Sequence, residues 1–196
     1  MKLPTYFGDG VHVMADLETL GTDGGVMIPQ IGAVAFRPND PPGTFLGTFV
    51  QWCSLAEQQD CGLRMDARTV QWWFEQDPEA IRAVFGKHNP KVNIHYALTN
   101  FSDFCSAHSA ERLWGHGATF DNVVLAAAFK AASVRSSIGF RGARDTRTLF
   151  DMVGGGDWSS DEMIDMDAFG PKHDALADAK RQVVVVQRAL RSLRGG

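Results

Sequence analysis

Long apolar stretches and paired cysteines are both missing from this sequence of 196 residues. No stretch reaches the roughly 18 apolar residues that a membrane-spanning helix needs. The first ten residues lack the apolar segment of about 7 to 15 residues found in a secretory signal peptide. The three cysteines, Cys53, Cys61 and Cys105, form no C-x-x-C pair, which argues against a disulfide framework or a zinc site. We therefore expect a cytoplasmic protein with free thiols and no membrane segment.

An excess of basic residues is also lacking, because the formal net charge is −4. This balance excludes a chain that coats itself in positive charge to bind nucleic acid non-specifically. It leaves open a nucleic-acid enzyme whose acidic residues cluster around metal ions. Hydrophobic residues make up 44% of the chain, which is enough for a substantial core, and the sequence contains no internal repeat. Length and composition together predict one domain over residues 1–196.

The order of apolar runs and turn signals predicts an α/β fold. Three strands come first as an antiparallel meander, then helices, a further strand and more helices, which fits a mixed sheet flanked by helices. A Gly-, Asp- and Met-rich stretch over 154–170 is expected to be a mobile loop. Strands are expected over 11–17, 28–36, 44–52 and 112–115. Helices are expected from an Asp66 cap to Gln76, from Pro78, within 93–109, from a Thr119 or Asp121 cap to about Ala132, over 146–152, and from near Asp174 to about Leu193.

Asp16 and Glu18 end the first expected strand and lie two residues apart. Successive side chains of a strand alternate between its faces, so both carboxylates project from the same face. Two neighbouring acids repel each other unless a cation lies between them or one of them takes up a proton. A hard divalent ion such as Mg²⁺ would relieve this repulsion. A solvated strand end beside a turn is the alternative.

Two further acidic positions follow the later elements. Asp121 comes after a short apolar strand, where it is either a site residue or a helix cap. His173 precedes the last expected helix and Asp178 lies inside it, so a loop-borne histidine can reach over a site that Asp178 faces. Asp174 fits the helix N-cap better than a ligand position.

These residues together resemble the DEDDh 3′–5′ exonucleases, which are ribonuclease T-like enzymes of the ribonuclease H-like fold. The matching motifs are D-x-E-T at Asp16–Thr19, F-D at Phe120–Asp121 and H-x-A-x-x-D-A at His173–Ala179. Their order and gaps agree with the family over about residues 10–190. The segments WGHGATFDN and RDTRTL and the pair Trp72-Trp73 are similar to a branch of bacterial exoribonucleases and phage exonucleases related to exonuclease VIII.

The resemblance implies a ribonuclease H-like mixed sheet and a two-metal-ion phosphodiesterase. Two Mg²⁺ or Mn²⁺ ions would be held by Asp16, Glu18, Asp121 and Asp178, and His173 would accept the proton of the attacking water. The products would be nucleoside 5′-monophosphates, released from single-stranded ends or 3′ overhangs of RNA or DNA. The family also suggests a homodimer. An inactive nucleic-acid-binding module and a zinc hydrolase are the alternatives; the first would have lost an acid or the histidine, and the second needs a nitrogen- or sulfur-rich ligand set.

Substrate contacts are less specified by the sequence. The resemblance places the turn of Thr19 and Leu20 against the 3′-terminal nucleotide, partly through backbone N–H groups and an apolar wedge. Phe120 either stacks on a base or packs in the core. Trp72 and Trp73 face about 100° apart on a helix, so at least one is expected in the core. A basic stretch over 130–147 is either a phosphate-binding rim or scattered surface charge, and an acidic stretch over 151–167 follows it. Asp145 is expected to form structural hydrogen bonds at a helix start.

Overall fold

The computed structural model describes residues 7–154 and 168–195. Most of the loop expected over 154–170, and most of the acidic stretch over 151–167, lie outside these residues. Among the described helices, none is both long and apolar enough to span a bilayer. All three cysteines are free, and Cys53 and Cys105 are buried, as the sequence indicated.

A six-stranded mixed sheet forms the centre of the protein, with the strand order β4-β3-β2-β1-β5-β6. Strands β1, β2 and β3 pair antiparallel as a meander, whereas β5 pairs parallel with β1 and β6 pairs parallel with β5. This arrangement confirms the predicted fold class. The strands are β1 (His12–Glu18), β2 (Gln30–Phe36), β3 (Gly47–Cys53), β4 (Lys91–Val92), β5 (Arg112–Gly115) and β6 (Ala143–Asp145).

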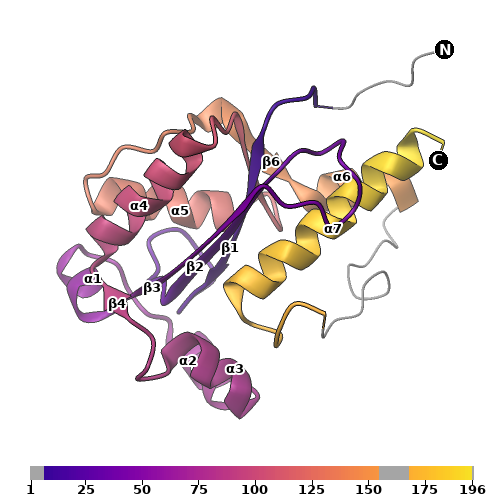
Figure 1. Ribbon diagram of the computed structural model, residues 1–196. Coiled ribbons are helices and arrows are strands. Elements are labelled where there is room, and N and C mark those ends of the chain that lie inside the picture. Colours follow the sequence, from indigo (N-terminus) through magenta and orange to yellow (C-terminus); the bar gives the residue numbers. More distant parts are fainter. Residues whose placement is uncertain (1–6, 155–167, 196) are drawn as a thin grey trace.

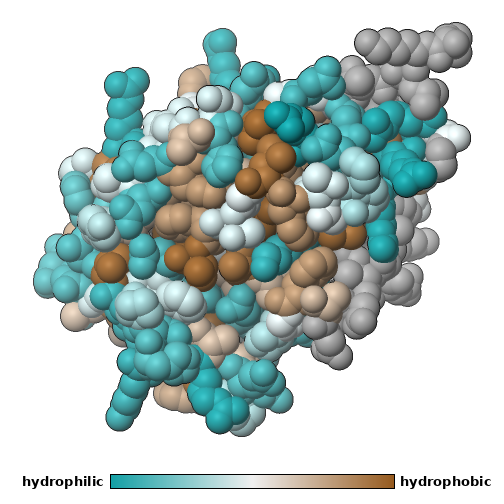
Figure 2. Space-filling model, in the orientation of Figure 1, coloured by the Kyte–Doolittle hydropathy of each residue, from teal (hydrophilic) through white to brown (hydrophobic). Residues whose placement is uncertain are grey.

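Helices cover both faces of the sheet (Figure 1). Helices α4 and α5 pack on one face, α6 and α7 pack on the other, and α2 and α3 extend beyond one end of the strands. The helices are α1 (Ala56–Asp60), α2 (Ala67–Phe74), α3 (Pro78–Phe85), α4 (Ile94–Ala107), α5 (Asp121–Ala131), α6 (Thr146–Gly154) and α7 (Ala175–Leu193). On the face shown in Figure 2, apolar side chains gather near the centre and polar side chains cover most of the periphery.

Strand β1 contributes to two separate hydrophobic clusters because its side chains alternate. Val13, Ala15 and Leu17 belong to the cluster under α4 and α5, while Met14 belongs to the cluster under α6 and α7. By the same alternation, Asp16 and Glu18 continue the Met14 side. The two carboxylates therefore face α7, the helix that carries Asp178.

The start of α7 lies directly against strand β2. A Cβ atom on Gly32 would lie 2.1 Å from the carbonyl carbon of Ala175, so only glycine permits this approach. Gln30, fully buried on the same strand, donates to the Asp174 carboxylate at 3.1 Å and accepts from the Ala175 N–H at 3.1 Å. Asp174 also accepts from the Ala177 N–H, so it caps α7 as predicted.

Of the other predicted helix starts, two agree with the structure and one is wrong. Asp66 caps α2 and Pro78 opens α3, as predicted. The predicted Thr119 or Asp121 cap of α5 is wrong, because Phe120 occupies the cap position and no side chain caps the helix. The short elements α1, β4 and β6 carry too few residues for their periodicity to be read from the sequence.

Candidate active site

A pocket of about 560 Å³ opens at the carboxyl end of β1. Of the predicted site residues, Asp16, Glu18, Thr19, Phe120, His173 and Asp178 line it. The pocket thus brings together residues from the first strand, the start of α5 and the start of α7. Leu20 and Asp121 are not on its wall. The other lining residues are Leu17, Gly21, Thr22, Arg68, Thr69, Trp72 and Trp73.

The acidic side chains lie close enough to repel one another. Burial raises the pKa of Asp16 well above its ordinary value, and the charges of Asp121, Asp178 and Glu18 raise it further. Burial also raises the pKa of Glu18 to about 8, with repulsion from Asp178, Asp174 and Asp121 adding to the shift. A cluster with such raised pKa values releases its protons when a cation binds beside it. Oxygen donors of this kind fit hard divalent cations.

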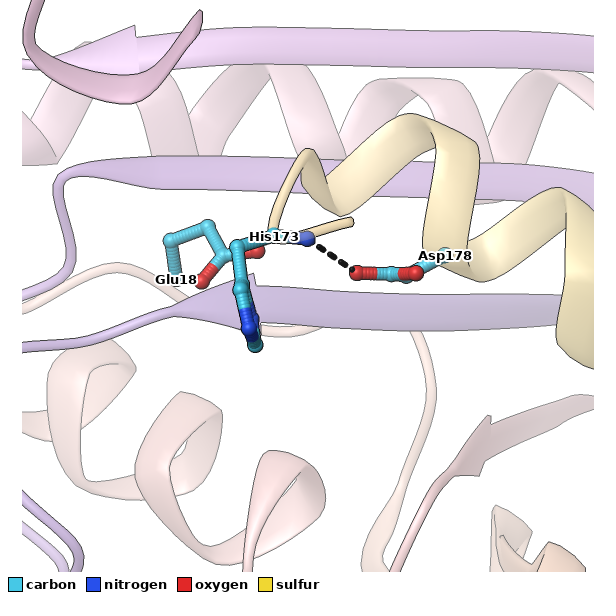
Figure 3. Close-up of side chains that lie close together, drawn as sticks. All are labelled: Glu18, His173 and Asp178. Atoms are coloured by element: carbon cyan, nitrogen blue, oxygen red, sulfur yellow. Dashed lines mark hydrogen bonds between the residues drawn. The ribbon is translucent and has the colours of Figure 1, made fainter. Parts of the chain in front are cut away.

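Glu18, His173 and Asp178 form a group that could hold a metal ion (Figure 3). One potential ligand atom from each lies within 4.8 Å of the other two. His173 has a φ of 60°, in the left-handed region, and its backbone N–H donates to Asp178 Oδ2 at 3.1 Å. In this backbone conformation, the His173 backbone is hydrogen-bonded to Asp178, the aspartate of the same motif.

The imidazole of His173 lies between the site and helix α2. The centre of its ring lies 5.0 Å from the ring centre of Trp72 and 6.0 Å from that of Trp73. In both pairs the two ring planes are nearly perpendicular. Burial lowers the pKa of His173, although the nearby Asp178 charge acts against this. The ring is therefore neutral at pH 7, the state in which it can accept a proton. Trp73 is buried, as expected for at least one of the two tryptophans, whereas Trp72 is 41% exposed.

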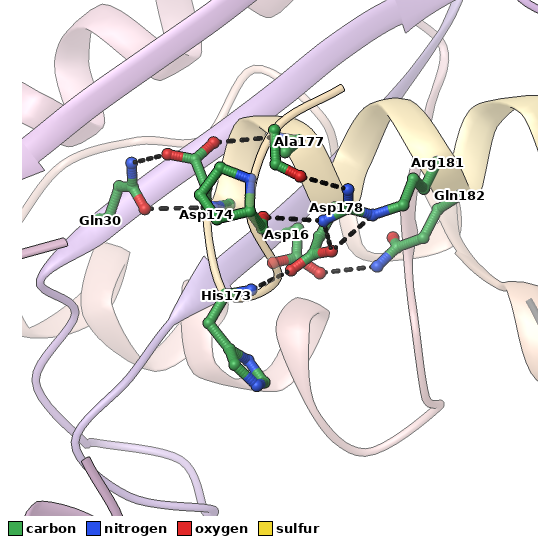
Figure 4. Close-up of polar contacts among 11 residues, drawn as sticks. Asp16, Gln30, His173, Asp174, Ala177, Asp178, Arg181 and Gln182 are labelled. Carbon is green, nitrogen blue, oxygen red and sulfur yellow. Dashed lines mark hydrogen bonds and ion pairs between the residues drawn. The ribbon is translucent and has the colours of Figure 1, made fainter. Parts of the chain in front are cut away.

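Two polar residues of α7 hold the carboxylates of the site in place (Figure 4). Gln182 Nε2 donates to Asp16 Oδ1 at 2.6 Å. Arg181, only 2% exposed, donates from Nε and Nη2 to Asp178 Oδ1 and also to the carbonyls of Gly170 and Pro171. A buried guanidinium thus joins Asp178 to the segment that leads into His173.

Asp121 lies behind the pocket wall and Leu20 lies in the core. Asp121 is 2% exposed, accepts from the His116 N–H at 2.7 Å, and has its pKa raised by burial to about 7. Its charge nevertheless acts on Asp16 and Glu18, so it belongs electrostatically to the cluster. Leu20 is 4% exposed and packs in the main hydrophobic cluster. Leu20 therefore does not line the pocket in this structure, and its contact with the terminal nucleotide stays a prediction.

Several residues of the site were not found from the sequence. Gln182 and Arg181 follow Asp178 by four and three positions, one turn of helix, so helical spacing from Asp178 could have indicated them. Arg68 and Trp72 are likewise one turn apart on α2 and share its pocket-facing side. No local pattern placed α2 over His173, because that contact depends on how α2 packs in the folded protein.

The fold and the site define a class of protein: an enzyme with a ribonuclease H-like mixed sheet and an acidic pocket at the end of its central strand. Residues 11–190 match the family model described as the 3′-5′ exoribonuclease Rv2179c-like domain. The chain belongs to this family. The resemblance to DEDDh exonucleases drawn from the motifs is thereby confirmed.

Solved structures with the same fold include two proteins of low sequence identity. Cell-death related nuclease 4 (CRN-4) has a TM-score of 0.64 and 15% identity, and the match covers 94% of this chain and 64% of that chain. Pop2p of S. pombe, in a form with Mg²⁺ and Mn²⁺ bound, has a TM-score of 0.59 and 13% identity over 94% of this chain and 84% of that chain. The chain therefore spans less than two thirds of CRN-4. A comparison with curated protein sequences gives no match.

Proposed function

We propose that the protein is a metal-dependent exonuclease that removes nucleoside 5′-monophosphates from the 3′ end of single-stranded RNA. One observation carries the proposal: Asp16, Glu18, His173 and Asp178, from opposite ends of the sequence, line one pocket. The name of the family, an exoribonuclease, supports RNA as the substrate. Single-stranded DNA and 3′ overhangs are the comparison substrates.

Asp16, Glu18, Asp121 and Asp178 would hold the metal ions, as proposed from the sequence. The raised pKa values of Asp16, Glu18 and Asp121 and the oxygen donors of all four residues fit Mg²⁺ or Mn²⁺, and the Mg²⁺- and Mn²⁺-bound form of Pop2p supports the same choice. When bound, two such ions supply charge neutralisation at the phosphate and a more acidic water.

His173 would act as the general base. Its imidazole is neutral at pH 7, lies beside Glu18 and Asp178, and is positioned by the two tryptophans of α2. Thr19 and Phe120 line the same pocket and would contact the terminal nucleotide. The single domain over 1–196, the homodimer and the cytoplasmic location stay predictions from the sequence.

Digestion of end-labelled oligonucleotides tests this proposal. With Mg²⁺ or Mn²⁺, 5′-labelled RNA should shorten step by step, and 3′-labelled RNA should release labelled mononucleotide from the start. Asp16→Asn should abolish turnover, whereas Asp23→Asn, which alters an exposed ion pair with Arg64, should leave it unchanged. Internal cleavage would overturn the exonuclease proposal, and binding without cleavage would favour an inactive binding module.

A further inference from the structure

The structure divides the basic stretch of the sequence between two ends of the sheet. Arg144 lies near the start of the strands: it donates to the carbonyls of Arg141 and Ala143, the charge of Arg112 acts on it, and its own charge acts on His12. Lys130 lies in the last turn of α5, one helix length away from the pocket. Arg147, by contrast, lies two residues beyond the carboxyl end of β6, which pairs with β5 beside the site. Of these three cations, Arg147 is the one at the acidic end.

The guanidinium of Arg147 is held in a defined orientation. Its Nε donates to His116 Nε2 at 3.4 Å. Because a guanidinium can only donate, His116 Nε2 is the acceptor and the imidazole proton resides on Nδ1, which lies 2.8 Å from Thr146 Oγ1. The ring of His116 thus fixes one edge of Arg147. Nη1 and Nη2 have no hydrogen-bond partner among the residues that the structure describes.

Arg147 lies just outside the pocket, beside the wall that Phe120 forms. Gly117, with a φ of 121°, separates the two: a Cβ atom there would lie 3.7 Å from both Arg147 Nη1 and Phe120 Cβ. Burial raises the pKa of Asp121, and the positive charge of Arg147 opposes that shift. Arg147 is exposed and does not line the pocket. Its free edge therefore faces the solvent next to the site.

We propose that Arg147 binds a phosphate of the substrate strand on the 5′ side of the scissile bond. The inference rests on the proposed function, in which the pocket takes the 3′-terminal nucleotide. The next phosphates must then lie outside the pocket, where a fixed guanidinium can bind one through two parallel hydrogen bonds. Arg181 cannot take this role, because it is buried on Asp178. Arg147 is therefore a substrate-binding residue that favours chains over mononucleotide esters.

Two substrates separate this role from a role at the reacting phosphate. An oligoribonucleotide has phosphates upstream of the scissile bond, whereas the p-nitrophenyl ester of uridine 5′-monophosphate has only the phosphate that is cleaved. Arg147→Ala should raise KM for the oligonucleotide about tenfold and change kcat/KM for the ester less than twofold. Arg144→Ala, which alters a cation at the other end of the sheet, is the matched control and should change neither.

Binding to an inactive background provides the second measurement. In Asp16→Asn protein, Arg147→Ala should weaken binding of a fluorescent oligoribonucleotide and lower the slope of log Kd against log salt by about 0.7, the value for one phosphate contact on a single strand. An unchanged slope, or an equal loss on oligonucleotide and ester, would overturn the proposal. If the wild-type protein cleaves nothing but the slope still falls, the proposed function fails and the phosphate contact stands.

Discussion

The stability of the metal-free protein should fall as pH rises above neutrality. An unfolded glutamate is ionised above its ordinary pKa of 4.5, but folded Glu18 keeps its proton up to a pKa of about 8. The folded state therefore binds more protons than the unfolded state, and the free energy of unfolding decreases with pH in this range. His12 and His173, whose pKa values are lowered in the folded protein from an ordinary value of 6.5, act in the opposite direction near pH 6.5, where the unfolded chain still protonates them in part, and this opposition fades about one pH unit higher.

The size of the effect follows from the pH interval. Between pH 6.5 and 8, folded Glu18 keeps a proton that the unfolded chain has lost, over 1.5 pH units. At 1.36 kcal/mol per unit, this corresponds to about 2 kcal/mol for Glu18 alone. For a protein of this size, the melting temperature should fall by about 4 to 8 °C. Glu18 is 6% exposed, so solvent screening reduces this figure little.

Thermal unfolding at pH 6.5 and pH 8, with EDTA or with Mg²⁺, measures the effect. Glu18→Gln should flatten the pH dependence of the EDTA sample, whereas Asp23→Asn, an exposed carboxylate, should leave it intact. Mg²⁺ should stabilise the wild-type protein more at pH 8, because fewer protons compete for the carboxylates. A metal-free protein whose melting temperature stays constant or rises between the two pH values would refute the reasoning.

Three substitutions away from the metal-binding positions test how the site is held. Gly32→Ala should push the start of α7 from β2 at Ala175 and reduce exonuclease turnover about a hundredfold; unchanged turnover would contradict the close approach. Arg181→Met should lower the free energy of unfolding by about 3 kcal/mol in urea, because Asp178 loses its buried partner; no loss would show that the pair is not stabilising. Asp66→Ala should cost about 1 kcal/mol in the same assay through the lost cap of α2.

Much of the fold followed from local patterns. Alternation along β1 placed Asp16 and Glu18 on one face, and the structure turns that face toward α7. The capping preferences of Asp66 and Asp174 located the starts of two helices. These features depend on neighbours in sequence, so the sequence carries them directly.

The remaining features depend on contacts between distant segments. Leu20 follows the first motif, but the chain turns it into the core, because its backbone pairs with Met27 and Asp66. Asp121 looked like a helix cap or a pocket residue, yet it is buried and does not line the pocket. Neither outcome is encoded in local periodicity, because each depends on which surface the folded chain brings against that residue.

The last helix has a consequence for the synthesis of the protein. Asp16 and Glu18 leave the ribosome more than 150 residues before Asp178 and the residues that orient it, which belong to α7. A growing chain that has not yet released α7 also lacks the partner that Gln30 and Gly32 of β2 receive. Under the proposed function, an unfinished polypeptide would be unable to degrade the message from which it is being made.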